Sequence, residues 1–154
     1  MKAKRSIYVK LRGWIVTIVS RAVETADVSK KPLPFNSENM SNLFAVQQVG
    51  HVNVIELILP DELDSVEFDK LNDSMLHLFD GRSSERWILD LSKTQYVGSA
   101  VLGLMVNVRQ HVKTAQGKLV ICSLSRTLND IFHASSLERL FTIAKNRNEA
   151  LKLL

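Results

Sequence analysis

The sequence predicts an α/β domain built on a mostly parallel sheet of about five strands with helices packed on it. Two observations predict it. Short apolar runs of strand length recur along the chain, and between them lie segments whose apolar residues recur at helical spacing. Strands that alternate with helices usually form a parallel sheet joined by right-handed crossovers. The expected order is β-β-α-β-α-β-α-β-α, and 154 residues suffice for a single domain with one core.

The first two strands are expected at residues 46–48 and 51–59, around a turn at Gly50. The second strand alternates at first and then becomes fully apolar, as a central strand does. Asp64 and Glu67 have the spacing of a capping box, which predicts that a helix begins there and ends before residues 80–84. The apolar residues at helical spacing in this helix are Phe68, Leu71, Met75, Leu78 and Phe79.

A short buried strand at residues 87–89 is expected to lead into Asp90, and a helix is expected over Ser99–Val112. The apolar stripe of that helix consists of Val101, Leu104, Met105, Val108 and Val112. A turn at Gly117 should precede a third buried strand at residues 118–122.

The remaining elements are expected to be short. Ser125 can cap a helix that carries Leu128, Ile131 and Phe132. A terminal strand is expected over Leu140–Ile143. Asn146 and Glu149 have the spacing to cap a last helix that bears Ala150, Leu151, Leu153 and Leu154.

Composition and charge exclude several classes of protein. Hydrophobic residues make up 45% and charged residues 23% of the chain, as in ordinary globular domains. No run approaches the roughly 18 apolar residues of a transmembrane helix, so we expect no stable membrane insertion. Of the formal net charge of +4, residues 1–39 contribute +5 and residues 40–154 contribute −1, so the folded part is close to neutral. This distribution argues against nucleic acid as a partner of the folded part.

Residues 1–39 are expected to be a basic extension and linker outside the domain, which we place at residues 40–154. The extension is predicted to be disordered or, if translation starts at Met40, not made. Its basic start and the apolar run at residues 14–19 resemble a signal peptide only poorly, because Arg21 ends the run early. A short basic helix on a membrane surface is a third interpretation.

The sequence lacks residues that the common enzymatic motifs require. Residues 98–103 have the glycine spacing of a phosphate-binding loop, but the Lys-Ser/Thr pair that should follow is missing. Ser99 lacks the flanking glycines of a nucleophile elbow. Cys122, the single cysteine, lies in an apolar run and is expected to be buried and inert. We therefore predict a protein that is not an enzyme and holds no cofactor and no metal, with scattered histidines and solvated acidic residues: His51, His77, His111, His133, Asp61, Glu62, Asp64, Asp69 and Asp73.

The most unusual local feature is the segment from Asp90 to Gly103. A strand ends at Asp90, a loop follows, and Ser99 lies at the start of the next helix. In an open α/β sheet, the edge formed by the carboxyl ends of the strands is the usual recognition surface. The segment therefore indicates a binding module. A serine at a helix start is also a good N-cap, so a plain capping role for Ser99 stays open.

At this point the sequence resembles the STAS domain of bacterial anti-sigma factor antagonists over about residues 43–154. The segments that carry the resemblance, in chain order, are Asp61-Glu62-Leu63-Asp64, Ile88-Leu89-Asp90-Leu91-Ser92, Tyr96-Val97-x-Ser99-x-x-Leu102-Gly103, Val120-Ile121-Cys122-x-Leu124-Ser125 and Ile131-Phe132-x-x-Ser135-x-Leu137. Several separated matches in the right order make the signal specific for the domain.

The resemblance implies a cytoplasmic, monomeric protein that binds an anti-sigma factor, a serine kinase with an ATPase-like fold, and thereby releases a sigma factor. In that family the kinase phosphorylates one serine of the antagonist, which ends binding, and a phosphatase restores it. The acceptor implied here is Ser99. Together with the polar stripe along the same helix, the partner-binding residues are then Asp64, Gly98, Ser99, Gly103, Asn107 and Gln110.

The motif also departs from the family pattern Asp-Ser-Ser/Thr-Gly-Leu-Gly. Gly98 replaces the aspartate, Ala100 the second hydroxyl residue and Val101 the first glycine. The loss of the acidic residue beside the acceptor suits an alternative function, a STAS interaction module outside sigma control, such as a scaffold or a transporter accessory subunit. A nucleotide or small-ligand sensor that uses the same sheet edge is a further alternative, weakened by the missing phosphate loop.

Overall fold

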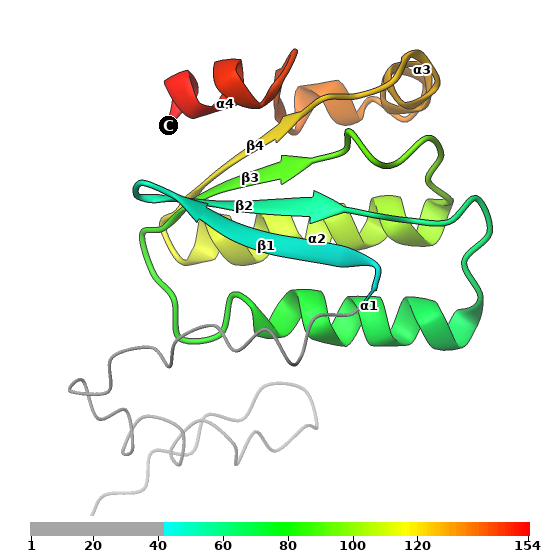
Figure 1. Ribbon diagram of the computed structural model, residues 1–154, viewed down its shortest axis with the longest axis horizontal. Coiled ribbons are helices and arrows are strands. Elements are labelled where there is room, and N and C mark those ends of the chain that lie inside the picture. The colour runs from blue at the N-terminus through cyan, green and yellow to red at the C-terminus, as the bar shows by residue number, and fades with distance from the viewer. Residues whose placement is uncertain (1–41) are drawn as a thin grey trace, which may run out of the picture. The chain divides into compact units, whose positions relative to one another are not determined.

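The computed structural model of the protein describes residues 42–154. The expectations for residues 1–39 and for a start at Met40 fall on residues outside this range. Within it, five strands form one sheet in the order β1-β2-β3-β4-β5 (Figure 1). The strands are β1 (Phe44–Val49), β2 (Val52–Leu57), β3 (Arg86–Asp90), β4 (Lys118–Cys122) and β5 (Thr142–Ala144). The helices are α1 (Ser65–His77), α2 (Ser99–Thr114), α3 (Arg126–Ala134), the 3-10 turn η2 (Leu137–Arg139) and α4 (Arg147–Leu153).

The predicted order and the mostly parallel sheet are both confirmed. β1 runs antiparallel to β2, and the other three pairs are parallel. The turn between β1 and β2 places Gly50 at a φ of +61°, a left-handed conformation that glycine adopts without steric penalty. Sequential order of parallel strands requires long crossovers, which α1, α2 and α3 supply.

The last strand is placed two residues later than expected. The sequence predicts a strand at Leu140–Ile143, whereas β5 covers Thr142–Ala144. Leu140 instead ends η2 in a right-handed helical conformation, and its N–H bonds back to Leu137 O at 2.9 Å. An apolar run cannot by itself distinguish the end of a helical turn from the start of a strand.

One face of the sheet is covered by α1 and α2, which lie side by side below it in Figure 1. We call it the α1/α2 face. Its side chains are large and apolar, and Phe79 packs on Trp87 with ring centroids 4.6 Å apart. α3 adds the buried side chains of Leu128 and Phe132 to the same core. The stripe predicted for α2 is buried here, as expected for an amphipathic helix.

The opposite face, which we call the α4 face, is covered by the seven-residue helix α4 (Figure 1). The buried residues of its core are mostly smaller: Val52, Val54, Ile88, Val120, Cys122, Ala144 and Ala150. Two carboxylates from neighbouring strands, Glu56 and Asp90, also reach Arg147 at the start of α4. The capping interaction predicted for this helix is present, since the Asn146 side chain accepts from Glu149 N at 2.9 Å.

Candidate functional site

The loop between β3 and α2 is held firmly at the carboxyl edge of the sheet. Leu91 N donates to Cys122 O at 3.0 Å, which continues the β3–β4 pairing by one residue. Thr94 is fully buried, and its hydroxyl donates to Leu57 O at 2.9 Å. Val97 is also buried, at 3% exposure. The loop therefore reaches Ser99 along a path set by contacts to both neighbouring strands.

Ser99 is the first residue of α2 and its side chain is exposed. Gly98 occupies the N-cap position in an extended conformation, and its carbonyl accepts the first helical bond from Leu102 N at 3.1 Å. The plain capping role considered for Ser99 is therefore wrong, because the N-cap is one residue earlier. Since glycine has no side chain, no side-chain acceptor caps the first N–H groups of α2.

The stripe predicted along α2 is exposed to solvent. Gly103, Asn107 and Gln110 lie on the side of the helix opposite to its buried stripe. Together with Ser99 they form a small, polar surface about three turns long, which we call the acceptor surface. At Gly103, which has no side chain, a partner's backbone can approach the helix closely.

A hollow with a volume of about 270 Å³ adjoins the start of α2. Its floor includes Phe68, Val97 and Val101, and its exposed rim includes Asp61, Glu62 and Tyr96, a residue that is 50% exposed. From the sequence, Asp61 and Glu62 were expected to be solvated charges, and Tyr96 was assigned no role of its own. The available signal was their position, because both carboxylates lie in the segment that follows β2 and thus near the same sheet edge as the loop to Ser99.

Asp64 does not line this hollow. Its carboxylate accepts from Glu67 N at 2.7 Å, and Glu67 reaches back to Asp64 N at 3.3 Å. The capping box predicted from the sequence is therefore confirmed. The side chain expected at the partner surface already has a structural task, the capping of α1.

Beneath the loop lies an ion cluster that the sequence did not reveal. Arg147 donates from Nε to Asp90 Oδ2 at 2.7 Å and from Nη2 to Glu56 Oε1 at 3.0 Å. Asp90 is 2% exposed, and its other oxygen accepts from Ser92 N at 3.0 Å. One carboxylate thus links α4 to the first residues of the loop that carries Ser99.

The protonation of this cluster follows from its contacts. Burial opposes the charge on Asp90, but hydrogen bonds from Ser92 and Arg147 outweigh it and hold the pKa of this carboxyl below its usual value. Burial also opposes the charge on Arg147, and the two carboxylates outweigh it and raise its pKa. Nearby, burial raises the pKa of the Cys122 thiol to about 11, so the expected inert, buried thiol is confirmed as buried and protonated.

Among residues 42–154, no three His, Cys, Asp or Glu side chains gather where they could hold a metal ion. None of the helices in the same range has the length and apolarity needed to cross a bilayer. What the edge presents is an exposed hydroxyl at a helix start, a polar helix surface, and an apolar hollow with an acidic rim.

Comparison with known proteins identifies the class. The family model of the STAS domain matches residues 45–150, and the chain belongs to this family. A curated relative, the putative anti-sigma factor antagonist BtrV of Bordetella bronchiseptica, is 30% identical over 69 residues. This match covers 45% of the present chain and 60% of the relative, which is less than two thirds of that protein's length.

Solved structures agree on the fold. An anti-sigma-factor antagonist (STAS) domain protein from Planctomyces limnophilus superposes with a TM-score of 0.63 at 21% identity, over 71% of this chain and 96% of that one. The Bacillus cell fate determinant SpoIIAA in its phosphorylated form gives a TM-score of 0.53 at 20% identity, over 71% and 96%. The expected fold, a single STAS-like α/β domain, is therefore confirmed.

Proposed function

We propose that this protein is an anti-sigma factor antagonist that is switched by phosphorylation of Ser99. In its unmodified form it binds an anti-sigma factor, a serine kinase with an ATPase-like fold, and so releases a sigma factor. The observation that carries the proposal is the exposed Ser99 hydroxyl at the first position of α2, within the family motif and on a loop held by buried contacts.

The position of Ser99 suits a reversible charge switch. The kinase would transfer the γ-phosphoryl group of ATP to the serine oxygen, with loss of the hydroxyl proton and release of ADP. The phosphate adds about −1.5 to −2 charges. At the start of α2 it faces N–H groups that no side chain caps and the positive end of the helix dipole, so the fold tolerates it.

The effect of the phosphate then falls on the partner. It would stand beside the acidic rim formed by Asp61 and Glu62, at the edge of the acceptor surface. A partner that approaches Gly103, Asn107 and Gln110 must desolvate the phosphate. A penalty of about 2.8 kcal/mol is enough for a hundredfold loss of affinity.

The structure leads us to revise the proposed surface in one respect. Asp64 remains a candidate, but its carboxylate is engaged in capping α1, whereas Asp61 and Glu62 line the hollow beside Gly98. These two residues are better placed to supply the charge that the family aspartate provides. We propose that a cytoplasmic, monomeric form of the protein uses this surface, that a phosphatase resets it, and that it acts through binding and not catalysis.

The test is a pull-down from native lysate with the full chain as bait in three forms. These are wild type, Ser99→Asp, and Ser83→Asp, which adds the same charge at an exposed serine between α1 and β3. Bound proteins and the phosphorylation state of Ser99 are identified by mass spectrometry. We expect an ATPase-fold kinase on wild type and Ser83→Asp, and its loss on Ser99→Asp.

Equal retention by all three baits would show that Ser99 is not the switch. Gly98, which removes the charge beside the acceptor, favours one alternative in that case. The protein would then be a STAS interaction module outside sigma control, a scaffold or a transporter accessory subunit. A transporter component retained equally by all baits would support that second function.

A further inference from the structure

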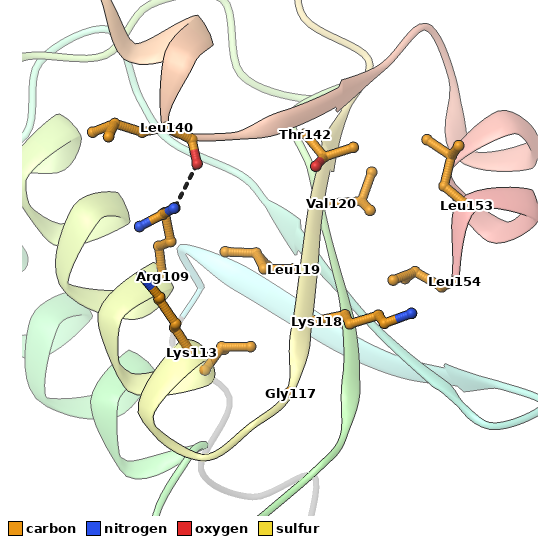
Figure 2. A pocket seen from close by; sticks show the side chains of 11 residues that line it. Arg109, Lys113, Gly117, Lys118, Leu119, Val120, Leu140, Thr142, Leu153 and Leu154 are labelled. Carbon is orange, nitrogen blue, oxygen red and sulfur yellow. Dashed lines mark hydrogen bonds between the residues drawn. The ribbon is translucent and has the colours of Figure 1, made fainter.

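A second hollow, with a volume of about 260 Å³, lies at the other end of the sheet from Ser99. It exists because β5 pairs only with Val120–Cys122, so Lys118 and Leu119 of β4 pair with β3 on one side and have no strand on the other. The end of α2 flanks this gap on one side and the end of α4 on the other (Figure 2). The site is therefore independent of the proposed function at the start of α2.

Three cationic side chains surround the hollow. Arg109 and Lys113 come from α2, and Lys118 comes from β4. Arg109 is held in place, because its Nε donates to Leu140 O and its guanidinium lies 6.0 Å from the Phe141 ring centroid. Within residues 42–154, none of the three forms an ion pair. Among the described residues, no carboxylate therefore lies within ion-pair distance of these three side chains.

The rest of the lining is apolar. Leu140 is 42% and Leu153 is 53% exposed, and these are two of the six large hydrophobic side chains that are exposed in the described part of the chain. Val112 and Val120 lie buried beneath. In Figure 2 Leu153 and Leu154 stand on the opposite side of β4 from Arg109 and Lys113. Lys118 extends toward Leu154, and Leu140 lies on the side of Arg109, so each side of the uncovered β4 edge carries both a cation and a leucine (Figure 2).

We propose that this hollow binds a small anionic amphiphile, a carboxylate or phosphate head on a short aliphatic chain. The head would lie at the uncovered β4 edge between Lys113 and Lys118, and the chain would cover Leu153 and Leu154, which lie on the same side of β4 (Figure 2). Such a ligand places opposite charge near unpaired cations and removes exposed leucine surface from water in the same step. The volume lies just below the usual range for ligand pockets, roughly 300–1,000 Å³, which restricts the ligand to a small one.

The probe is sodium hexanoate, titrated into the full, isotopically labelled chain and followed by amide chemical shifts. 1-Hexanol, which has the chain without the charge, and inorganic phosphate, which has the charge without the chain, form two further arms. We expect hexanoate to shift the amides of Lys118, Leu119 and Leu153. We also expect it to bind at least tenfold more tightly than either of the other probes.

Variants locate the two halves of the site. Lys113→Gln combined with Lys118→Gln should weaken hexanoate at least tenfold and leave hexanol unchanged. Leu153→Ser should weaken both. Lys70→Gln, at an exposed lysine of α1, is the matched control and should change neither.

Three outcomes would overturn the proposal. Equal affinity for hexanol would reduce the hollow to an apolar patch, and equal affinity for phosphate would reduce it to a simple anion site. Tighter binding of an acidic peptide such as acetyl-Leu-Glu-Glu-amide than of hexanoate, with the same amides shifted, would instead identify a protein segment as the occupant.

Discussion

The two faces of the sheet are built in different ways. On the α1/α2 face, two helices of 13 and 16 residues cover large apolar side chains such as Trp87 and Leu89. On the α4 face, a helix of seven residues covers mostly smaller side chains, and Arg147 joins it to two strand carboxylates. Buried apolar contacts hold the helices on the first face, whereas an ion cluster helps to hold α4 on the second.

The difference follows from the length of the covering element. A seven-residue helix buries little apolar surface, and its position is poorly determined by packing alone. A buried ion cluster contributes little net stability, but its geometry is specific. Because Asp90 binds both Arg147 and Ser92 N, the cluster that positions α4 also orients the start of the loop to Ser99. The thinly covered face is therefore connected to the candidate site through this ion cluster, although α2, which carries Ser99, covers the other face.

The largest effect is expected on the α1/α2 face. Trp87 is 2% exposed and packs on Phe79, so Trp87→Ala should lower the free energy of unfolding by about 3–5 kcal/mol. Urea unfolding of the full chain measures it, and the loss should be the same at pH 7 and pH 5. A loss below about 1 kcal/mol would mean that this face does not carry the core.

The next effect concerns the α4 face. Arg147→Met leaves the buried Asp90 carboxylate without its cation and should cost about 3 kcal/mol at pH 7, the low end for a broken buried pair because Arg147 is partly exposed. The pKa of Asp90 is lowered in the native protein, so its contribution is present above the unfolded pKa and disappears as pH falls through the folded pKa.

The deficit of Arg147→Met should therefore shrink below about pH 4, whereas that of Trp87→Ala should not. The double variant Arg147→Met with Asp90→Asn is the control, because it removes the unpaired charge and should regain part of the loss. A deficit independent of pH would assign the role of Arg147 to packing.

A third prediction uses Cys122 as a reporter of the α4 face. Burial raises the pKa of its thiol from 9.0 to about 11, which lowers the thiolate fraction at pH 8 about a hundredfold. Modification by a disulfide reagent should be at least a hundredfold slower in the native chain than in urea. In Arg147→Met it should be about tenfold faster than in wild type, because α4 is held less firmly. Equal rates in wild type and variant would show that the ion cluster does not hold α4 over Cys122.

The smallest change in stability is expected on the exposed side of α2, which packs against neither face of the sheet. Gly103 lies in the exposed part of α2, and an added Cβ would meet nothing within 4 Å. Gly103→Ala should stabilise the protein by about 0.5–1 kcal/mol, measured by thermal unfolding. Gly117→Ala is the contrasting variant, because its Cβ would come within 2.6 Å of Glu85 O and should destabilise. If Gly103→Ala also weakens binding of the partner identified by pull-down, close approach to the acceptor surface is supported.

Sequence patterns predicted most elements because their cause is local. The stripe from Val101 to Val112 and the capping box of Asp64 and Glu67 depend on residues a few positions apart, and both are present. Ser99 was placed at a helix start for the same reason. The sequence did not show that Gly98 is the last extended residue and the N-cap, which makes Ser99 the first residue of the helix.

The hollow beside Gly98 could be anticipated only in part. The carboxyl ends of parallel strands meet at one edge, which brings Asp61 and Glu62 toward the loop to Ser99. The sequence does not say which of the acidic residues in the segment 61–64 turns toward α2. The structure shows that Asp64 caps α1, and that Asp61 and Glu62 line the hollow.

By itself, the sequence determined the order of strands and helices, the parallel sheet, the apolar stripes and the motif around Ser99, since hydrophobic periodicity and capping act over short distances. Only the tertiary structure decided that Arg147 meets Asp90 and Glu56, which are 57 and 91 residues away in the chain. It also decided that β5 begins at Thr142 and leaves the cationic hollow beside β4. Such contacts depend on how whole elements pack, and no local pattern specifies that.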